Sequence, residues 1–307
     1  MVAAAIVERR ARHLLAWATC GSLLGWLLGY AVPAHASPLQ NRLRGFTVGA
    51  HRGGFWSLVQ GTTDDFVTSL EGGADIIELD LRWTKDGGVV VYHSDTLSKH
   101  TFCLGLVRDK TFAEVTQCRL LPTGALIQSF EEVLQWARGK NVILNAEFKD
   151  DEVIEPALKL VEKYDAWDQI YFQANAHYDR YARARELSPR ADMLVNVGDM
   201  DRLRWALDLG DPHLLVIGLR GERIQTREAV ALVHRSGKVA SANSWPTAQL
   251  QELFTAACDH FFEIGIDVAI TNNVQSCVTQ RDAIRAVDAP RMTGEDLSLV
   301  TRPGLRQ

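Results

Sequence analysis

The chain has 307 residues, of which 47% are hydrophobic and 23% are charged, and its formal net charge is −5. This length and hydrophobic content suffice for one large core, and the acidic balance argues against a nucleic-acid-binding protein, which would usually be basic. No proline- or serine-rich linker divides the chain after residue 36, so we expect one large α/β domain at 45–290 and a C-terminal tail at 291–307.

The N-terminal segment has the pattern of a secretory signal. Three arginines before residue 13 precede an apolar stretch, Leu14–Val32, that holds no charged residue, and Ala34–Ala36 follows with the small-x-small pattern of a cleavage site. We therefore expect residues 1–36 to be removed and the mature protein to be periplasmic or secreted. The alternative is an uncleaved membrane anchor at 14–32, because a spanning helix needs roughly 20 apolar residues.

Export would place four cysteines in an oxidising compartment, where disulfides persist. Cys103 and Cys118 flank one short segment, and Cys258 and Cys277 flank the last predicted strand, so we expect these two local disulfides. Buried free thiols are the alternative for the second pair. None of the four belongs to a Cys-x-x-Cys motif, which argues against a zinc site.

Short apolar runs alternate with amphipathic stretches from residue 46 onward. Such alternation over about 250 residues predicts a (β/α)8 TIM barrel whose second position holds a tight strand pair, and a doubly wound open sheet is the alternative. The predicted strands are Phe46–Ala50, Ile76–Arg82, Val89–His93, Val142–Phe148, Ile170–Ala174, Met193–Asn196, Leu214–Gly218, Val239–Asn243 and Val268–Thr271. The predicted helices are Asp64–Glu71, Phe130–Ala137, Val153–Tyr164, His177–Leu187, Asp201–Leu209, Arg227–His234, Pro246–Cys258 and Val274–Val287.

Acidic and histidine side chains fall in or near the ends of these strands. Glu78 and Asp80 lie two residues apart in an isoleucine-rich strand, so both point to the same face. In a (β/α)8 barrel the chemistry collects at the C-terminal ends of the strands, where His51, His93 and Glu147 also fall. Carboxylates supply oxygen ligands to Ca²⁺ or Mg²⁺, and imidazole can move a proton near neutral pH. The pattern therefore predicts a metal site beside an acid/base pair.

The complete set of motifs resembles the glycerophosphodiester phosphodiesterase family. That family shows His-Arg-Gly, then Gly-Ala-Asp-x-Ile-Glu-x-Asp-x-x-x-Thr-Lys-Asp-Gly, then a histidine on the next strand and an Asn-x-Glu-x-Lys strand. In this chain the four parts lie at 51–53, 73–87, 93 and 145–149. The resemblance implies hydrolysis of glycerophosphodiesters to sn-glycerol 3-phosphate and an alcohol, through attack of the glycerol 2-hydroxyl on phosphorus and a cyclic phosphate that water opens.

The resemblance also implies roles for individual residues: acid/base catalysis by two histidines, phosphate binding by two cations, and binding of Ca²⁺ or Mg²⁺ by three carboxylates. The two histidines are His51 and His93, the two cations are Arg52 and Lys149, and the three carboxylates are Glu78, Asp80 and Glu147. An insertion commonly caps the site in this family, and we expect residues 98–127, which lack a sustained period, to form such a substrate-shaping loop.

Some positions depart from the family pattern. Gln60 replaces a glutamate, and the usual Thr-Asp-x-Pro near the C-terminus becomes Thr-Asn-Asn-Val at 271–274. Positions near Asn243 and Trp245 tend to line the substrate pocket, so the identity of the alcohol is open. Trp245 could offer an aromatic wall to a choline-like head group, although a core or rim tryptophan is the alternative.

These departures leave two other functions open. Related phospholipase D-like enzymes share the barrel, the histidines and the acidic ligands, but release a cyclic phosphate from lysophospholipids or sphingomyelin. An apolar patch around the insertion would favour that activity, because such a lipid must be drawn from a membrane. A secreted protein that binds metal or phosphate without turnover is the second alternative. Apart from the signal or anchor segment and a lipid substrate, we expect no membrane contact.

Overall fold

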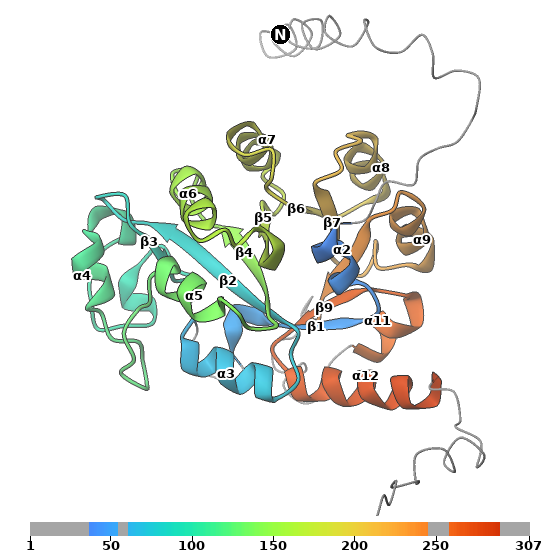
Figure 1. The fold of residues 1–307 in the computed structure, drawn as a ribbon, viewed down its shortest axis with the longest axis horizontal. Helices are drawn as coiled ribbons and strands as arrows, with labels where there is room; N and C mark the ends of the chain where they lie inside the picture. Colours follow the sequence, from blue (N-terminus) through green and yellow to red (C-terminus); the bar gives the residue numbers. More distant parts are fainter. Residues whose placement is uncertain (1–36, 55–60, 245–257, 289–307) are drawn as a thin grey trace, which may run out of the picture. The chain divides into compact units, whose positions relative to one another are not determined.

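The computed structural model describes residues 37–54, 61–244 and 258–288. Within them, eight parallel strands form a closed barrel, in the order β1-β9-β8-β7-β6-β5-β4-β2, with pairing between β1 and β2 closing the ring. The parallel strands are β1 Thr47–Ala50, β2 Ile76–Trp83, β4 Ile143–Phe148, β5 Ile170–Gln173, β6 Met193–Val197, β7 Leu214–Leu219, β8 Val239–Asn243 and β9 Val268–Thr271. A short strand, β3 (Val89–Val91), pairs antiparallel with the C-terminal end of β2, at residues 81–83 (Figure 1).

Helices follow the strands and surround the barrel (Figure 1). Several begin where a side chain caps the first free backbone N–H groups; Ser129, for example, forms a capping box with Glu132 at the start of α5. The described helices around the barrel are α3 Thr63–Glu71, α5 Phe130–Ala137, α6 Ile154–Tyr164, α7 Tyr178–Leu187, α8 Met200–Asp208, α9 Arg227–Arg235, α11 Cys258–Ile264 and α12 Val274–Asp288.

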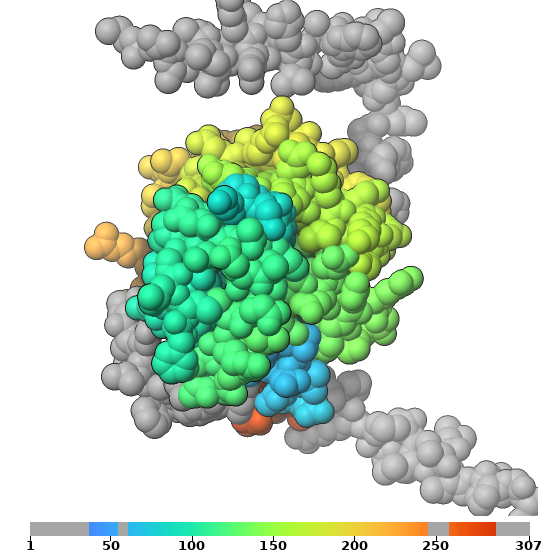
Figure 2. Space-filling model, turned by 90° about the vertical axis from the view of Figure 1, so that its left-hand side faces the viewer, coloured from blue at the N-terminus to red at the C-terminus, as the bar shows by residue number. Residues whose placement is uncertain are grey.

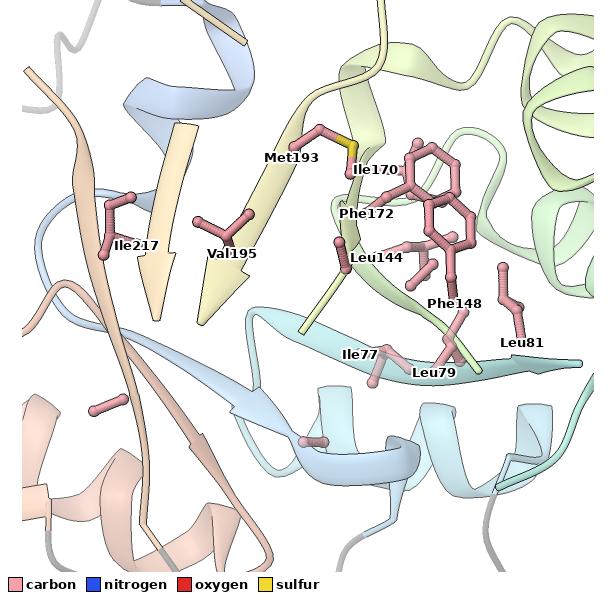
Figure 3. Packing of buried hydrophobic residues seen from close by; sticks show 14 of the residues in the cluster. Ile77, Leu79, Leu81, Leu144, Phe148, Ile170, Phe172, Met193, Val195 and Ile217 are labelled. Carbon is pink, nitrogen blue, oxygen red and sulfur yellow. The ribbon is translucent and has the colours of Figure 1, made fainter. Parts of the chain in front are cut away.

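Alternation along each strand divides the core into two layers. Figure 3 shows side chains such as Ile77, Leu79 and Phe172 on the outer face of the strands, in the core that the helices cover. The intervening residues, including Glu78 and Asp80, point into the barrel because side chains alternate between faces. The hydrophobic layer between strands and helices thus fixes which residues reach the barrel interior.

A short helix ahead of the barrel was not expected from the sequence. This helix, α2 (Pro38–Leu43), begins with a Ser37 cap and buries Leu39 and Leu43 among inward-facing residues such as Ile76 and Tyr171. Six residues are too few to show a helical period, so the pattern could not reveal it. The helix lies before the predicted domain start at residue 45 and adds apolar contacts to the barrel interior.

The predicted (β/α)8 barrel is confirmed, and its closure excludes the open sheet, which would have two free edges. The strands lie close to their predicted positions, but β3 ends at Val91, so His93 lies in the loop that follows. The expected signal at 1–36, the tail at 291–307, Gln60 and Trp245 lie outside the described residues. No helix in the described ranges is long and apolar enough to cross a membrane.

The insertion at 98–127 packs with β3 and the residues after it around a small cluster separate from the main core, and it forms much of the face seen in Figure 2. It contains α4 (Phe112–Thr116) and a short 3-10 helix, Val107–Asp109, and another 3-10 helix, Leu97–Lys99, leads into it. A disulfide joins Cys103 to Cys118 within it, and a second joins Cys258 to Cys277, with Cα separations of 5.9 and 5.4 Å. The structure therefore contains both expected local pairs.

Candidate active site

Three carboxylates meet inside the C-terminal end of the barrel. Glu78 and Asp80 come from β2, and Glu147 comes from β4, where it is in register with Asp80. One oxygen from each lies within 4.8 Å of the others, and the three residues are only 4%, 4% and 8% exposed. Such a donor set, all oxygen and all anionic, is the kind that Ca²⁺ and Mg²⁺ prefer. The predicted metal ligands are thus brought together.

Two cations lie against these carboxylates. The Lys149 Nζ is 2.6 Å from Glu147 Oε1 and 3.3 Å from Asp80 Oδ1, because Lys149 follows β4 on the same face as Glu147. The Arg52 Nε is 3.4 Å from Asp80 Oδ2, and its backbone N–H donates to Glu78 Oε2 at 2.6 Å. Both predicted phosphate-binding residues therefore reach the same cavity as the acids.

The turn after β1 sets the position of Arg52. Arg52 itself has φ 53°, in the left-handed region, and this conformation directs its N–H toward Glu78. Gly53 follows with φ 71°, and a Cβ there would overlap the ring of Phe66. The His-Arg-Gly motif is thus needed for backbone geometry as well as for its side chains.

The two histidines enter the cavity from neighbouring segments. His51 Nδ1 lies 2.6 Å from Asn272 Oδ1, and its Nε2 lies 4.0 Å from Glu78 Oε2. His93 lies after β3, where its carbonyl accepts hydrogen bonds from the Arg82 guanidinium at 2.8 and 3.0 Å. Arg82 is in turn paired with Asp150 at 2.8 Å. Asn272 therefore holds the ring of His51, and Arg82 holds the main chain at His93.

Burial and mutual repulsion perturb the acids. Burial raises the pKa of Glu78, and the charges of Asp80 and Glu147 raise it further. Burial and the charge of Asp80 likewise raise the pKa of Glu147, although Lys149 and Arg220 partly offset this. Burial alone would raise the pKa of Asp80, but Lys149 and other positive neighbours together lower it.

The donor set fits a divalent cation for an electrostatic reason. Three buried carboxylates cannot all ionise without cost, and the raised pKa values of Glu78 and Glu147 express that cost. A bound divalent cation would remove it, because the ion favours the charged form of each ligand. Lys149 and Arg52, which contact Asp80 and Glu147, supply only part of this compensation.

Both histidines are held in the neutral form. Burial lowers the pKa of His51 to about 4, and the Arg52 charge adds to the effect. Burial also lowers the pKa of His93 to about 4; the Asp80 charge opposes this, and the charges of Arg52 and Lys149 support it. Neutral imidazoles can accept a proton at neutral pH, which is the state required of a general base.

The cavity around these groups has a volume of about 120 Å³ and a mostly polar wall. It includes Asn243 and every other predicted site residue that the structure describes. Three further polar residues of this wall belong to no recognisable sequence motif: Gln173, Asn175 and Arg220. Gln173 ends β5, Asn175 lies just after β5, and Arg220 directly follows β7. This position at the C-terminal ends of the strands is the signal that could reveal them in the sequence.

Of these, Gln173 contacts the acids directly. Its Nε2 donates to Glu147 Oε2 at 2.9 Å, so it orients the carboxylate oxygen that Lys149 does not bind.

A model of the glycerophosphoryl diester phosphodiesterase family matches residues 51–275. The chain belongs to that family. Among members, a glycerophosphodiester phosphodiesterase of Bacillus altitudinis is 27% identical over 234 residues, which cover 69% of this chain and 92% of that protein. YqiK of Bacillus subtilis (strain 168) is 30% identical over 162 residues, covering 49% of this chain and 66% of YqiK.

A third relative is a glycerophosphodiester phosphodiesterase of Caldanaerobacter subterraneus subsp. tengcongensis, 30% identical over 140 residues; the match covers 42% of this chain and 58% of that protein. A solved glycerophosphoryl diester phosphodiesterase of Parabacteroides distasonis has a TM-score of 0.67 at 22% identity, with 84% of this chain and 94% of that chain covered. This structural likeness supports the barrel fold of the family.

Proposed function

We propose that this protein hydrolyses glycerophosphodiesters to sn-glycerol 3-phosphate and an alcohol, with Ca²⁺ or Mg²⁺ bound by Glu78, Asp80 and Glu147. The observation that carries the proposal is the convergence of three buried carboxylates, two cations and two neutral histidines on one polar cavity. A cation held there would polarise a phosphoryl oxygen and offset the charge that develops in the transition state.

Arg52 and Lys149 would bind the phosphate oxygens. Arg52 presents a planar fork and Lys149 a point charge, and both already face the carboxylates in the cavity. Stabilisation of developing charge by such fixed donors is often the largest single contribution to catalysis. The two residues would therefore hold the phosphodiester with its reactive phosphorus between the histidines.

His51 is the better placed base for the first step. With Nδ1–H donating to Asn272, its Nε2 carries the lone pair and can take the proton of the glycerol 2-hydroxyl as that oxygen bonds to phosphorus. His93 would give its proton to the departing alkoxide, since the bound phosphate anion raises the pKa of an adjacent imidazole. Water then opens the cyclic phosphate: His93 takes the water proton and His51 returns its own to the 2-oxygen.

³¹P NMR of the purified protein with glycerophosphocholine, and then glycerophosphoethanolamine, tests this proposal. Glycerol 3-phosphate should appear with Ca²⁺ or Mg²⁺ and should disappear with EDTA. Glu78→Gln keeps the shape of the side chain without its charge, so it should abolish the product as well. Tight binding of Ca²⁺ without turnover of any phosphodiester would instead support the non-catalytic binding protein.

One observation favours the lyase alternative enough to include it in the experiment. Phe102 and Leu104, on either side of a disulfide-bonded cysteine in the insertion, are 84% and 74% exposed. Exposed apolar side chains at a rigid loop could enter a lipid surface. A cyclic phosphate signal from a lysophospholipid, without reaction of glycerophosphocholine, would assign the protein to that class.

We also propose that the protein is exported. Two disulfides within the described residues are typical of proteins in an oxidising compartment. Cell fractionation with N-terminal sequencing tests this proposal: a mature N-terminus at Ser37 in the extracytoplasmic fraction supports cleavage, and an intact chain in the membrane supports the anchor at 14–32.

A further inference from the structure

Arg220 adds a third cation to the cavity, on the side away from the predicted metal ligands of β2. It directly follows β7, and β7 lies opposite β2, because three strands separate the two in either direction around the barrel (Figure 1). Arg220 is exposed and lines the cavity.

A chain of amides holds Arg220 in place. Its Nη1 donates to Asn175 Oδ1 at 2.7 Å, and the same oxygen accepts from Asn196 Nδ2 at 2.6 Å. Asn196 lies in β6 in register with Gly218 of β7, and a Cβ at Gly218 would overlap its Oδ1. Neighbouring strands thus contribute to one support for the guanidinium.

The partner of Arg220 is a neutral amide. Within the described ranges, no carboxylate forms an ion pair with its guanidinium. An arginine has five N–H donors, so the single contact with Asn175 leaves most of its fork able to bind a ligand in the cavity. Carboxylates and phosphates are the groups whose geometry matches that fork.

The charges around the cavity indicate what this ligand carries. The three cations Arg52, Lys149 and Arg220 balance the three carboxylates, so a divalent cation leaves an excess of two positive charges. The phosphodiester group supplies one negative charge. One positive charge then remains. Arg52 and Lys149 contact the carboxylates, whereas Arg220 contacts a neutral amide, so Arg220 is the cation best placed to bind a further anion. A second anionic group on the substrate would neutralise it.

The described part of the wall does not favour a cationic head group. None of the described residues that line the cavity is Phe, Tyr or Trp, so they provide no aromatic face for a quaternary ammonium group. Arg220 would also repel such a group. The sn-glycerol part of the substrate carries only hydroxyls, so a second anion has to belong to the alcohol.

We propose that Arg220, supported by Asn175, is a specificity residue that binds an anionic group, a carboxylate or a phosphate, on the alcohol of the glycerophosphodiester. This inference rests on the proposed function and names its substrate class. Because Arg220 is absent from the acid/base and phosphate-binding steps, it should affect which alcohol is preferred more than the chemistry itself.

The test uses two pairs of substrates that differ only in the anion. Glycerophosphoserine is glycerophosphoethanolamine with an added carboxylate, and glycerophosphoglycerol can be compared with its terminally phosphorylated form. For the purified holoenzyme with Mg²⁺ or Ca²⁺, kcat/KM should be about tenfold or more higher for the anionic member of at least one pair. The pair with the larger ratio identifies carboxylate or phosphate as the preferred group.

Variants separate specificity from a structural effect. Arg220→Gln should lower kcat/KM for the anionic substrate about tenfold and change its neutral counterpart less than about twofold. Arg220→Lys should retain part of the preference, because it keeps the charge but loses the fork. Arg223→Gln removes an exposed arginine from the same loop and should leave the ratio unchanged.

Two results would overturn the inference: an equal loss of activity toward both members of a pair in Arg220→Gln, or a wild-type ratio near one for both pairs. If no substrate is hydrolysed, the proposed function fails separately. The role of Arg220 in binding is then tested by calorimetry, which measures Kd for the same substrates with His93→Ala, alone and combined with Arg220→Gln. Tighter binding of the anionic member that depends on Arg220 supports the site, and equal binding refutes it.

Discussion

The Nδ1 atom of His51 lies 2.6 Å from the amide oxygen of Asn272, the first residue after β9. The family pattern usually has aspartate at this position. An amide accepts the same hydrogen bond but brings no negative charge, so burial and the Arg52 charge lower the pKa of His51 to about 4. His51 therefore remains available as a base well below neutral pH.

Asn272→Asp should raise the pKa of His51, because a carboxylate next to Nδ1 stabilises the protonated ring. A protonated His51 cannot act as the base, so the acidic limb of the pH profile of kcat/KM should move upward by about 1–3 pH units. Activity on the plateau above this limb should change much less. Steady-state kinetics from about pH 4 to about pH 9 measure the shift.

Asn272→Ala is the control for that prediction. It removes the hydrogen bond without adding charge, so activity should fall while the acidic limb does not move upward. An unchanged limb in Asn272→Asp would show that His51 does not set it, and the assignment of His51 as base would then be wrong.

Glu78→Gln should remove cation binding and stabilise the metal-free protein at higher pH. The pKa of Glu78 is raised in the folded state by burial, Asp80 and Glu147, so its stabilising contribution is present below the unfolded pKa and is lost as pH rises through the folded pKa. In EDTA, the Tm of the variant relative to wild type should therefore increase with pH. A neutral glutamine at this position cannot show that loss.

Ca²⁺ or Mg²⁺ provides the complementary measurement. A cation at 100 times its Kd stabilises the folded state by about 2.7 kcal/mol, which corresponds to a rise in Tm of roughly 5–10 °C for a domain of this size. Wild type should show this rise, and Glu78→Gln should show little of it. An equal rise in both proteins would place the cation elsewhere.

The barrel could be predicted because apolar strands and amphipathic helices alternate with a clear period. Local patterns fail where an element is short: α2 has six residues, and its burial of Leu39 and Leu43 depends on a barrel end built from distant strands. The apolar run before His93 predicts a strand that reaches it, but pairing between β2 and β3 stops at Val91.

The candidate site could be predicted where residues form a contiguous motif, as Glu78 and Asp80 do. Asn175 and Arg220 could not be found in this way, because each is a single polar residue after a different strand. Only the placement of β5 and β7 on either side of β6 brings Arg220 Nη1 to 2.7 Å from Asn175 Oδ1. Asn272 was visible as a departure from the family pattern, but its contact with His51 depends on pairing between β1 and β9.

Gly218→Ala should disturb the support of Arg220. The new Cβ would overlap Asn196 Oδ1, so Asn196 must move away from Asn175, at a cost of about 1–3 kcal/mol in the free energy of unfolding. Urea denaturation measures this cost. The preference for an anionic alcohol should fall as well, while hydrolysis of the neutral counterpart persists. Stability equal to that of wild type would show that Asn196 does not need this space.

The disulfide in the insertion should affect the site more than the barrel. Cys103 and Cys118 close a loop with a sequence separation of 15, for which the loss of chain entropy predicts about 3 kcal/mol of stabilisation. Cys118 also packs in the small cluster that contains Val90 and Tyr92, which precede His93. Replacing both cysteines by serine should therefore increase proteolysis within 98–127 and lower kcat/KM, with little change in the Tm of the barrel.

The second disulfide provides the matched comparison. Cys258 and Cys277 have a similar separation of 19 residues, but both are buried in the main core between helices and strands. Their replacement by serine should lower the Tm of the whole domain, because it removes a cross-link and buries two hydroxyl groups within the main hydrophobic core. If instead both double variants lose Tm to the same extent, the insertion and the barrel unfold as one cooperative unit, and its loop cannot move independently to admit substrate.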